Sequence, residues 1–258
     1  MNRITELFRN KPKELLSIYF TAGYPRLDDT LLIAKNLEEA GADMLEIGFP
    51  FSDPLADGPV IQQSSEIALK NGMNLNTLFS QLKHLREQIR IPVLLMGYIN
   101  PVMQYGIERF CASCFECGID GLIIPDLPMT EYEEEYRELF EKNRLSNIFL
   151  VTPESSEERI RKIDGLSRGF IYALSSSSTT GKDMASHAGT ELYFKKLRSM
   201  ELHNPLLIGF GVSDRESFQK VVTYANGAII GSAFIRLLGR EGARPEAIKT
   251  FIHSIIGK

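Results

Sequence analysis

The sequence predicts a (β/α)8 barrel, and two regularities along the chain lead to this fold class. Eight short runs of apolar and β-branched residues recur over the whole length, as expected for strands that are buried on both faces. Segments with helical spacing lie between these runs, and such an alternation is typical of a parallel barrel surrounded by helices. A doubly wound open sheet is the alternative, although that fold more typically has about five or six strands.

The predicted strands follow one another at fairly regular intervals. No linker or low-complexity tract separates them, so we expect residues 1–258 to form a single barrel domain with a short N-terminal helix. The eight runs are LLSIYFTAG from Leu15, DMLEIGFP from Asp43, IPVLLMGY from Ile91, DGLIIPD from Asp120, NIFLVTP from Asn147, GFIYALS from Gly169, NPLLIGFG from Asn204 and NGAIIGS from Asn226.

The segments between the strands carry helix signals. TLLIAKNLEEAG reaches a glycine stop directly after Ala40, and NTLFSQLKHLREQI has leucine or isoleucine at helical spacing. Two further segments open with a hydroxyl residue and have a glutamate three residues later, which is the pattern of a capping box. These pairs are Thr130 with Glu133 and Ser213 with Glu216.

Composition argues against several classes of protein: nucleic-acid-binding, disulfide-rich, secreted and membrane-spanning proteins. The chain has 258 residues, 43% of them hydrophobic and 24% charged, and a net charge of -4, which favours neither nucleic acid nor an anionic membrane as a partner. Three cysteines do not suggest a disulfide framework. The N-terminus lacks the apolar core of a signal peptide, and no apolar run approaches the roughly 18 residues of a membrane span. We therefore expect a cytoplasmic protein without a membrane segment.

Glu46 stands out because it is an acid inside an apolar strand. Side chains alternate along a strand, so Met44, Glu46 and Gly48 share one face while Leu45 and Ile47 share the other. The apolar pair suits packing against helices, which leaves Glu46 pointing into the barrel. A buried carboxyl tends to be protonated and can exchange a proton near neutral pH. The alternative is a glutamate paired with a base, but the strand runs contain almost no Lys or Arg.

Three aspartates follow the predicted strands. Asp53 and Asp57 lie in the Pro- and Gly-rich loop after the second strand, and Asp126 ends the fourth. In a barrel of this kind the active site lies at the C-terminal ends of the strands. Such residues also stabilise turns, and the first two could equally cap the following helix. Taken alone, the three aspartates are therefore more readily explained as structural.

Glycines gather in the last third of the chain. Backbone N–H groups beside glycines at helix N-termini bind anions, and barrels commonly place a phosphate after the seventh and eighth strands. Gly211, Gly231 and Ser232 occupy those places, and Gly181 lies in the preceding loop. TTGKD is not a Walker loop, because it lacks the leading glycine and the hydroxyl residue after lysine. We expect a phosphate site, not a nucleotide fold.

No metal site is predicted. The three cysteines have the spacing C-x2-C-x2-C but lack the fourth thiolate of an iron–sulfur site, so packed thiols on one helix face are the better interpretation. The four histidines are scattered without ligand spacing. The small, polar stretch from Ser175 to Gly189 suits a lid or a disordered segment.

Taken together, these segments resemble the α subunit of tryptophan synthase over essentially the whole chain. LEIGFPFSDPLADGP is the most specific of them, and the others occur in the family's order: FTAGYP, MGYINPV, IIPDLP, GFGVSD and GAIIGSAF. The resemblance implies a lyase that cleaves indole-3-glycerol phosphate to indole and glyceraldehyde 3-phosphate without a cofactor. It also implies a partner, the tryptophan synthase β subunit, in an αββα heterotetramer.

The resemblance assigns roles to particular residues. Glu46 and Asp57 match the two catalytic carboxylates: Glu46 performs acid–base chemistry, and an ionised Asp57 accepts a hydrogen bond from the indole N–H and stabilises positive charge on the ring. Phosphate is held at the four glycine-loop positions named above, and Thr180 and Lys182 belong to the lid. The implied indole pocket consists of Tyr19, Ile61, Ile123, Leu150, Tyr172, Phe210 and Ile229, each of which could also be plain core.

One departure from the family concerns the lid, where Ser176 and Ser178 stand in places that many members fill with Arg and Gly. Two other functions stay open. The chain could be a different phosphosugar barrel enzyme, such as an isomerase, against which the Glu46 to Asp57 spacing argues. It could also be a non-catalytic subunit that only activates a partner, against which the intact carboxylate pair argues.

Overall fold

The structure is a computed structural model that describes residues 2–54, 57–174, 187–209 and 211–258. Its strands form one parallel sheet in the order β5-β4-β3-β2-β1-β9-β8-β7-β6. The bounds are β1 Leu15–Thr21, β2 Met44–Gly48, β3 Val93–Met96, β4 Gly121–Ile123, β5 Ser146–Ile148, β6 Leu150–Val151, β7 Ile171–Leu174, β8 Leu206–Gly209 and β9 Gly227–Ile230.

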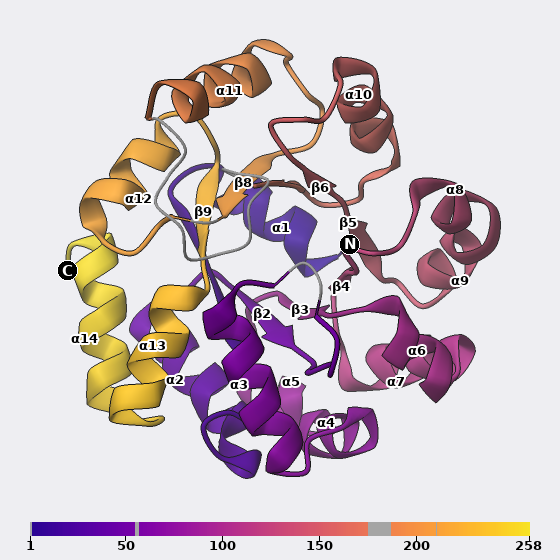
Figure 1. The fold of residues 1–258 in the computed structure, drawn as a ribbon, viewed down its shortest axis with the longest axis vertical. Helices are drawn as coiled ribbons and strands as arrows, with labels where there is room; N and C mark the ends of the chain where they lie inside the picture. Colours follow the sequence, from indigo (N-terminus) through magenta and orange to yellow (C-terminus); the bar gives the residue numbers. More distant parts are fainter. Residues whose placement is uncertain (1, 55–56, 175–186, 210) are drawn as a thin grey trace.

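The sheet closes on itself because its two end strands are one stretch of chain. β5 and β6 are separated only by Phe149, whose carbonyl accepts a hydrogen bond of 3.0 Å from the amide of Tyr172. The pair corresponds to the single predicted run NIFLVTP, so the eight predicted runs account for the whole barrel (Figure 1). The predicted (β/α)8 barrel is confirmed.

Helices surround the barrel on its outside (Figure 1). The α-helices are α1 Arg3–Asn10, α2 Thr30–Ala40, α3 Pro59–Lys70, α4 Leu75–Leu82, α5 Leu85–Gln88, α6 Ile99–Tyr105, α7 Ile107–Cys117, α8 Met129–Glu131, α9 Arg137–Lys142, α10 Glu157–Leu166, α11 His187–Ser199, α12 Arg215–Val222, α13 Ser232–Glu241 and α14 Pro245–Ile256. A 3-10 turn, η1 (Leu27–Asp29), precedes α2, and a π-helical turn, η2 (Tyr132–Tyr136), joins α8 to α9.

Successive side chains of a strand point to opposite faces of the sheet, so the strands contribute to two apolar cores. Leu45 and Ile47 pack in the outer core between the strands and the helices. Met44 lies in the inner core, inside the barrel, together with residues from most of the other strands. The predicted inward face of β2 is therefore confirmed, and Glu46 lies on it.

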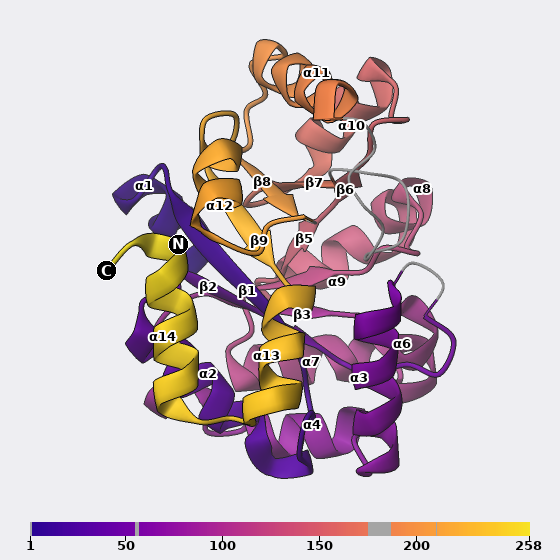
Figure 2. The same ribbon diagram turned by 60° about the vertical axis from the view of Figure 1, so that its left-hand side comes forward.

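Helix α1 closes the N-terminal end of the barrel, at the left of Figure 2. Its buried residues, Ile4 and Phe8, belong to the inner core, and the Phe8 ring lies 6.1 Å from the ring of Phe170. This apolar plug leaves the opposite, C-terminal end as the place where the barrel interior can meet a ligand.

The helix signals were only partly right. α2 ends at Ala40 with Gly41 in the left-handed conformation, as predicted. The Thr130–Glu133 capping box is wrong, because α8 begins after Pro128 without a side-chain cap. The second capping box is shifted by one residue: Asp214 caps α12 and pairs with Ser217, since an aspartate in extended backbone accepts the helix N–H groups as well as a serine does.

The cysteines are packed thiols. Cys111, Cys114 and Cys117 all lie buried on one face of α7, in the outer core. Burial raises the pKa of each thiol, that of Cys111 to about 12 and that of Cys117 to about 11. Thiols of this kind are unreactive near neutral pH, which fits a structural role.

Candidate active site

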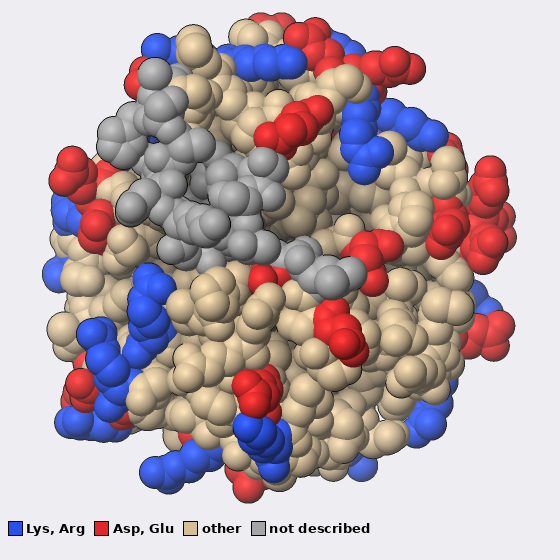
Figure 3. Space-filling model, in the orientation of Figure 1, with Lys and Arg blue, Asp and Glu red and all other residues tan. Residues whose placement is uncertain are grey.

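The C-terminal face of the barrel carries the candidate site. Figure 3 looks onto this face and shows a hollow near its middle, in which the visible atoms belong to uncharged residues. A small cavity on this face joins the loop after β2 to β1, β3 and the loop after β4. It is lined by Tyr19, Phe49, Phe51, Asp57, Ser65, Met96, Gly97, Tyr98 and Pro125.

Glu46 lies inside the barrel near this cavity. Its side chain is fully buried, and its Oε1 accepts a hydrogen bond of 2.7 Å from the Ser17 hydroxyl. Its Oε2 is buried without a hydrogen-bond partner in the described part of the chain. Burial raises the pKa of Glu46 from 4.5 to about 7, although the Ser17 hydroxyl acts in the opposite direction. A carboxyl with such a pKa can both donate and accept a proton at neutral pH.

Asp57 reaches the same cavity from the loop that precedes α3. It is half-buried, and burial raises its pKa from 3.8 to about 6, against a hydrogen bond from Tyr98 that lowers it. The sequence allowed Asp57 to be the cap of α3, but the N-cap is Gly58 and no side chain caps this helix. The Asp57 side chain therefore does not cap the helix, and it lines the cavity instead. Its carboxylate stays mainly ionised above about pH 6.

Two buried tyrosines are affected by the charges of both carboxyl groups. Tyr19 and Tyr172 are buried, and burial is the main reason why the pKa of each hydroxyl is raised. The negative charges of both Glu46 and Asp57 raise the two values further. Tyr19 is the neighbour of Glu46 in the sheet register and lines the same cavity as Asp57, so it lies between the two carboxyl groups.

Glycines make room for these rings. Tyr19 stands beside Glu46 in the parallel register and crosses over Gly48, where a Cβ would collide with its hydroxyl. The ring of Tyr172 covers Gly209 in the same way. The absence of side chains at these two inward positions lets the aromatic rings form the mouth of the barrel.

The candidate phosphate site lies at the ends of β8 and β9. Gly211 has a left-handed backbone, with a φ of 79°. Gly231 is the N-cap of α13, and no side chain caps that helix, so the N–H groups at its first turn, which begins with Ser232, remain available to an anion. The structure thus brings Gly211, Gly231 and Ser232 to the C-terminal face, as expected for a barrel.

Most of the predicted indole-pocket residues line the barrel interior. Ile123, Tyr172 and Ile229 belong to the inner core, and Leu150 packs partly against it. Ile61 on α3 belongs instead to the outer core. Six residues from the sequence analysis lie outside the described residues. They are Phe210 of the pocket, Gly181 of the phosphate site, Thr180 and Lys182 of the lid, and the departures Ser176 and Ser178.

The other two aspartates have local partners. The exposed Asp53 accepts a hydrogen bond of 2.5 Å from Ser52, its chain neighbour. Asp126, also exposed, accepts a hydrogen bond of 3.0 Å from the amide of Ile99, at the start of α6. The structural interpretation of both residues fits these contacts.

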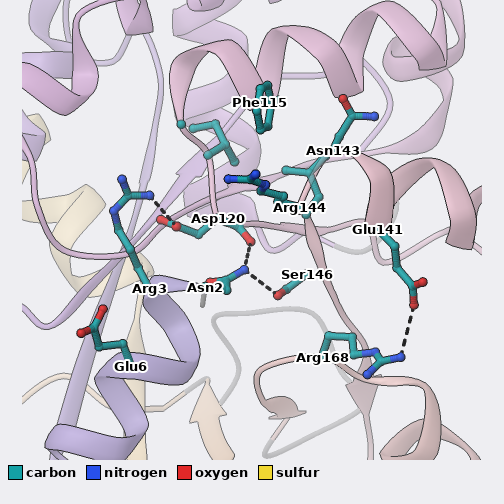
Figure 4. A pocket seen from close by; sticks show the side chains of 13 residues that line it. Asn2, Arg3, Glu6, Phe115, Asp120, Glu141, Asn143, Arg144, Ser146 and Arg168 are labelled. Carbon is teal, nitrogen blue, oxygen red and sulfur yellow. Dashed lines mark hydrogen bonds and ion pairs between the residues drawn. The ribbon is translucent and has the colours of Figure 1, made fainter.

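A larger cavity lies at the N-terminal end, where α1 meets the loops before β4, β5 and β7 (Figure 4). Four of its charged side chains form ion pairs with one another: Arg3 contacts Asp120 at 3.0 Å, and Arg168 contacts Glu141 at 3.3 Å. Asp120 also accepts hydrogen bonds from Arg86 and from the amide of Val93. These ion pairs join α1 and the neighbouring loops at this end of the barrel.

Two residues of the site were missed from the sequence. Ser17 is on the inward face of β1, two residues before Tyr19, and strand alternation could have placed it beside Glu46. Tyr98 lies two residues after the end of β3, and functional side chains of a barrel lie at such strand ends. Its ring also lies 5.5 Å from that of Phe51, which helps to hold the loop that carries Asp57.

The described part of the chain offers neither a membrane-spanning helix nor a cluster of metal ligands. No helix there is long and apolar enough to cross a membrane. Those residues also contain no group of three or more His, Cys, Asp or Glu side chains that could hold a metal ion.

Comparisons with known proteins agree with the geometry. Residues 6–254 match the family described as "Tryptophan synthase alpha chain". Proteins of that name are 50% identical in Parabacteroides distasonis, over 99% of both chains, and 55% identical in Christiangramia forsetii, over 94% of both chains.

Solved structures show the same likeness. The tryptophan synthase subunit alpha from Legionella pneumophila superposes with a TM-score of 0.89 at 32% identity, over 99% of this chain and 97% of that one. A tryptophan synthase structure from M. tuberculosis superposes with a TM-score of 0.85 at 28% identity, over 99% and 98% of the two chains.

Proposed function

The chain belongs to the family of tryptophan synthase alpha chains, and from this premise we propose that Glu46 and Asp57 together carry its reaction. The protein is a lyase of tryptophan biosynthesis that cleaves indole-3-glycerol phosphate to indole and glyceraldehyde 3-phosphate. The observation that best supports the proposed residues is the buried carboxyl of Glu46, which has one oxygen without a partner among the described residues and lies on the inward face of the barrel.

Glu46 supplies and recovers one proton in this proposal. Its neutral carboxyl protonates indole C3, which places positive charge on the ring. The resulting carboxylate then takes the proton of the glycerol hydroxyl next to that carbon. The O–H electrons form the aldehyde carbonyl, and the C–C bond electrons return to the ring as indole leaves. The cycle ends with Glu46 protonated again, and a pKa of about 7 suits both steps.

Asp57 stabilises the intermediate. Its carboxylate accepts a hydrogen bond from the indole N–H and lies close to the positive charge that develops when C3 is protonated. Above about pH 6 it is mainly ionised, so it is charged when the reaction begins. Two carboxyl groups in different surroundings thus take different roles, one as the acid–base group and one as a fixed negative charge.

The phosphate of the substrate is held, in this proposal, by the backbone around Gly211, Gly231 and Ser232. The uncapped N-terminus of α13 offers N–H groups and the positive end of a helix dipole. The indole ring occupies the barrel mouth, against Tyr19 and Tyr172. No step requires a cofactor, because the protons come from the carboxyl group and the substrate itself.

We further propose that the chain works with a tryptophan synthase β subunit, in an αββα assembly, and that it does so in the cytoplasm. Support for both statements comes from the family and from its place in amino-acid biosynthesis. Size-exclusion chromatography of the chain mixed with a β subunit tests the assembly, and separate elution of the two proteins would contradict it.

An indole-release assay tests the function. The isolated chain should release indole from indole-3-glycerol phosphate, faster in the presence of a β subunit. Glu46→Gln and Asp57→Asn should each lose activity, while Asp53→Asn, a matched change in the same loop, should keep it. Isomerisation of the substrate without indole release would indicate a different barrel enzyme. No release by the isolated chain would indicate a subunit that only activates its partner.

A further inference from the structure

We propose that Ser17 is a positioning residue for the cleavage: its hydroxyl fixes Oε1 of Glu46 as a hydrogen-bond acceptor and so keeps the transferable proton on Oε2. This inference rests on the proposed role of Glu46 as the acid–base group. It concerns a residue that the family resemblance does not single out and that lies on a different strand from Glu46.

The contact is buried and well formed. Ser17 is fully buried on the inward face of β1, and its Oγ lies 2.7 Å from Oε1 of Glu46. Its neighbours in the two flanking strands are Met44 and Ile229, both apolar members of the inner core. Within the described residues, Glu46 is the side chain to which this hydroxyl donates.

The direction of this hydrogen bond decides which oxygen carries the carboxyl proton. A serine hydroxyl has one hydrogen, and here it is donated to Oε1. An ionised carboxylate only accepts hydrogen bonds, so the Ser17 hydroxyl donates to Oε1 whenever Glu46 has lost its proton. Oε2 has no such donor, so its negative charge is the less stabilised of the two. Oε2 is therefore the oxygen that takes up the proton from the substrate, and the bond from Ser17 to Oε1 stays in place as it does so.

The other ionisable groups facing Glu46 do not replace Ser17. Tyr19 on β1 and Tyr172 on β7 feel its charge, but neither donates a hydrogen bond to it: Oε1 is bound by Ser17, and Oε2 has no partner among the described residues. Asp57 carries a like charge and cannot donate when ionised. Ser17 thus has two effects on Glu46: it orients the proton, and it opposes the rise in pKa that burial causes.

Ser17→Ala tests the inference in two ways. Loss of a donor to the carboxylate raises the pKa of Glu46, so the alkaline limb of the kcat/KM profile should move up by about one pH unit. The kcat value should fall by roughly 2- to 10-fold with little change in KM, because the proton is no longer confined to one oxygen. The infrared carbonyl band of protonated Glu46, identified by its loss in Glu46→Gln, should move to higher frequency.

Three variants complete the experiment. Ser17→Thr keeps the hydroxyl and should behave like the parent. Ser17→Cys has a weaker donor of similar size and should give an intermediate shift, which also serves if the Ala variant fails to fold. Ser146→Ala is the matched control, since Ser146 is a buried strand serine that accepts a hydrogen bond of 3.0 Å from Asn2, at the N-terminal end of the barrel. Its pH profile should be unchanged.

The outcomes separate this inference from the function on which it rests. A carboxyl band and an alkaline limb that stay at the parental positions in Ser17→Ala would overturn the role of Ser17 alone. An active Glu46→Gln variant would overturn the proposed function, whatever the band does. A shifted band and limb in Ser17→Ala, restored in Ser17→Thr, would establish the positioning role.

Discussion

Replacing Glu46 by glutamine should change the stability of the fold in a pH-dependent way. The group is fully buried, and its pKa in the folded protein is about 7, compared with 4.5 for an ordinary glutamate. Because the folded value is the higher one, folding favours the neutral form. The destabilisation from ionising Glu46 is absent below about pH 4.5, grows as the pH rises toward 7, and is constant above that.

The magnitude follows from the size of the shift. Each pKa unit corresponds to about 1.4 kcal/mol, so the shift from 4.5 to about 7 amounts to about 3 kcal/mol at pH 8. Glutamine never ionises. The free energy of unfolding of Glu46→Gln, minus that of the parent, should therefore rise by about 3 kcal/mol between pH 4.5 and pH 8. Any fixed cost of placing the amide beside Ser17 cancels in this comparison.

Urea unfolding of both proteins across this pH range measures the difference, because the free energy of unfolding falls linearly with denaturant. Carboxylates that are common to both proteins contribute equally and cancel. Glu6→Gln, the same substitution at an exposed position on α1, is measured alongside as the control. A difference between Glu46→Gln and the parent that is constant with pH would refute the raised pKa and the acid–base argument built on it.

The remaining predictions concern the pH profile and the phosphate site. The reactive form has Asp57 ionised and Glu46 protonated, so kcat/KM for indole release should be bell-shaped, with limbs near pH 6 and pH 7; a profile that is flat over this range would contradict the assignment. Tyr98→Phe removes a hydrogen bond that lowers the pKa of Asp57, so only the acid limb should move, to higher pH; movement of the alkaline limb instead would show that Tyr98 acts elsewhere. Gly231→Ala should weaken binding of inorganic phosphate in calorimetry, because a Cβ at the N-cap of α13 takes up space beside the anion. The free energy of unfolding should change by less than about 0.5 kcal/mol, because the nearest atoms to the new Cβ are those of Tyr19, at an ordinary contact distance of 3.4 Å, and the φ of -118° suits alanine. Unchanged phosphate affinity would place the anion elsewhere.

The alternation of side chains along a strand correctly predicted the side of β2 on which Glu46 lies. The inward position of Glu46 followed from the apolar partners Leu45 and Ile47, and the structure agrees because the two faces of a barrel strand meet different surroundings. The same rule, applied to β1, could have placed Ser17 beside Glu46. It was overlooked because a serine in an apolar strand carries no signal until the position of its partner is known.

Other features depend on the three-dimensional structure. The break at Phe149 and the cap at Asp214 depend on local backbone geometry that the residue pattern does not specify. The raised pKa of Asp57 could not be inferred either, because a loop aspartate between prolines and glycines is ordinarily solvated. It is half-buried here because the chain folds back beside Tyr98 and Phe51.

In the proposed mechanism, Glu46 transfers the proton that leads to cleavage of the C–C bond. The most direct test mixes a stoichiometric excess of Glu46→Gln with indole-3-glycerol phosphate, quenches the mixture at intervals and measures both bound substrate and released indole. The account predicts that the substrate binds about as well as to the parent protein, while the rate of indole formation falls by about 10² to 10⁴-fold. Indole formation at a rate close to that of the parent would contradict the account and assign the proton to another group.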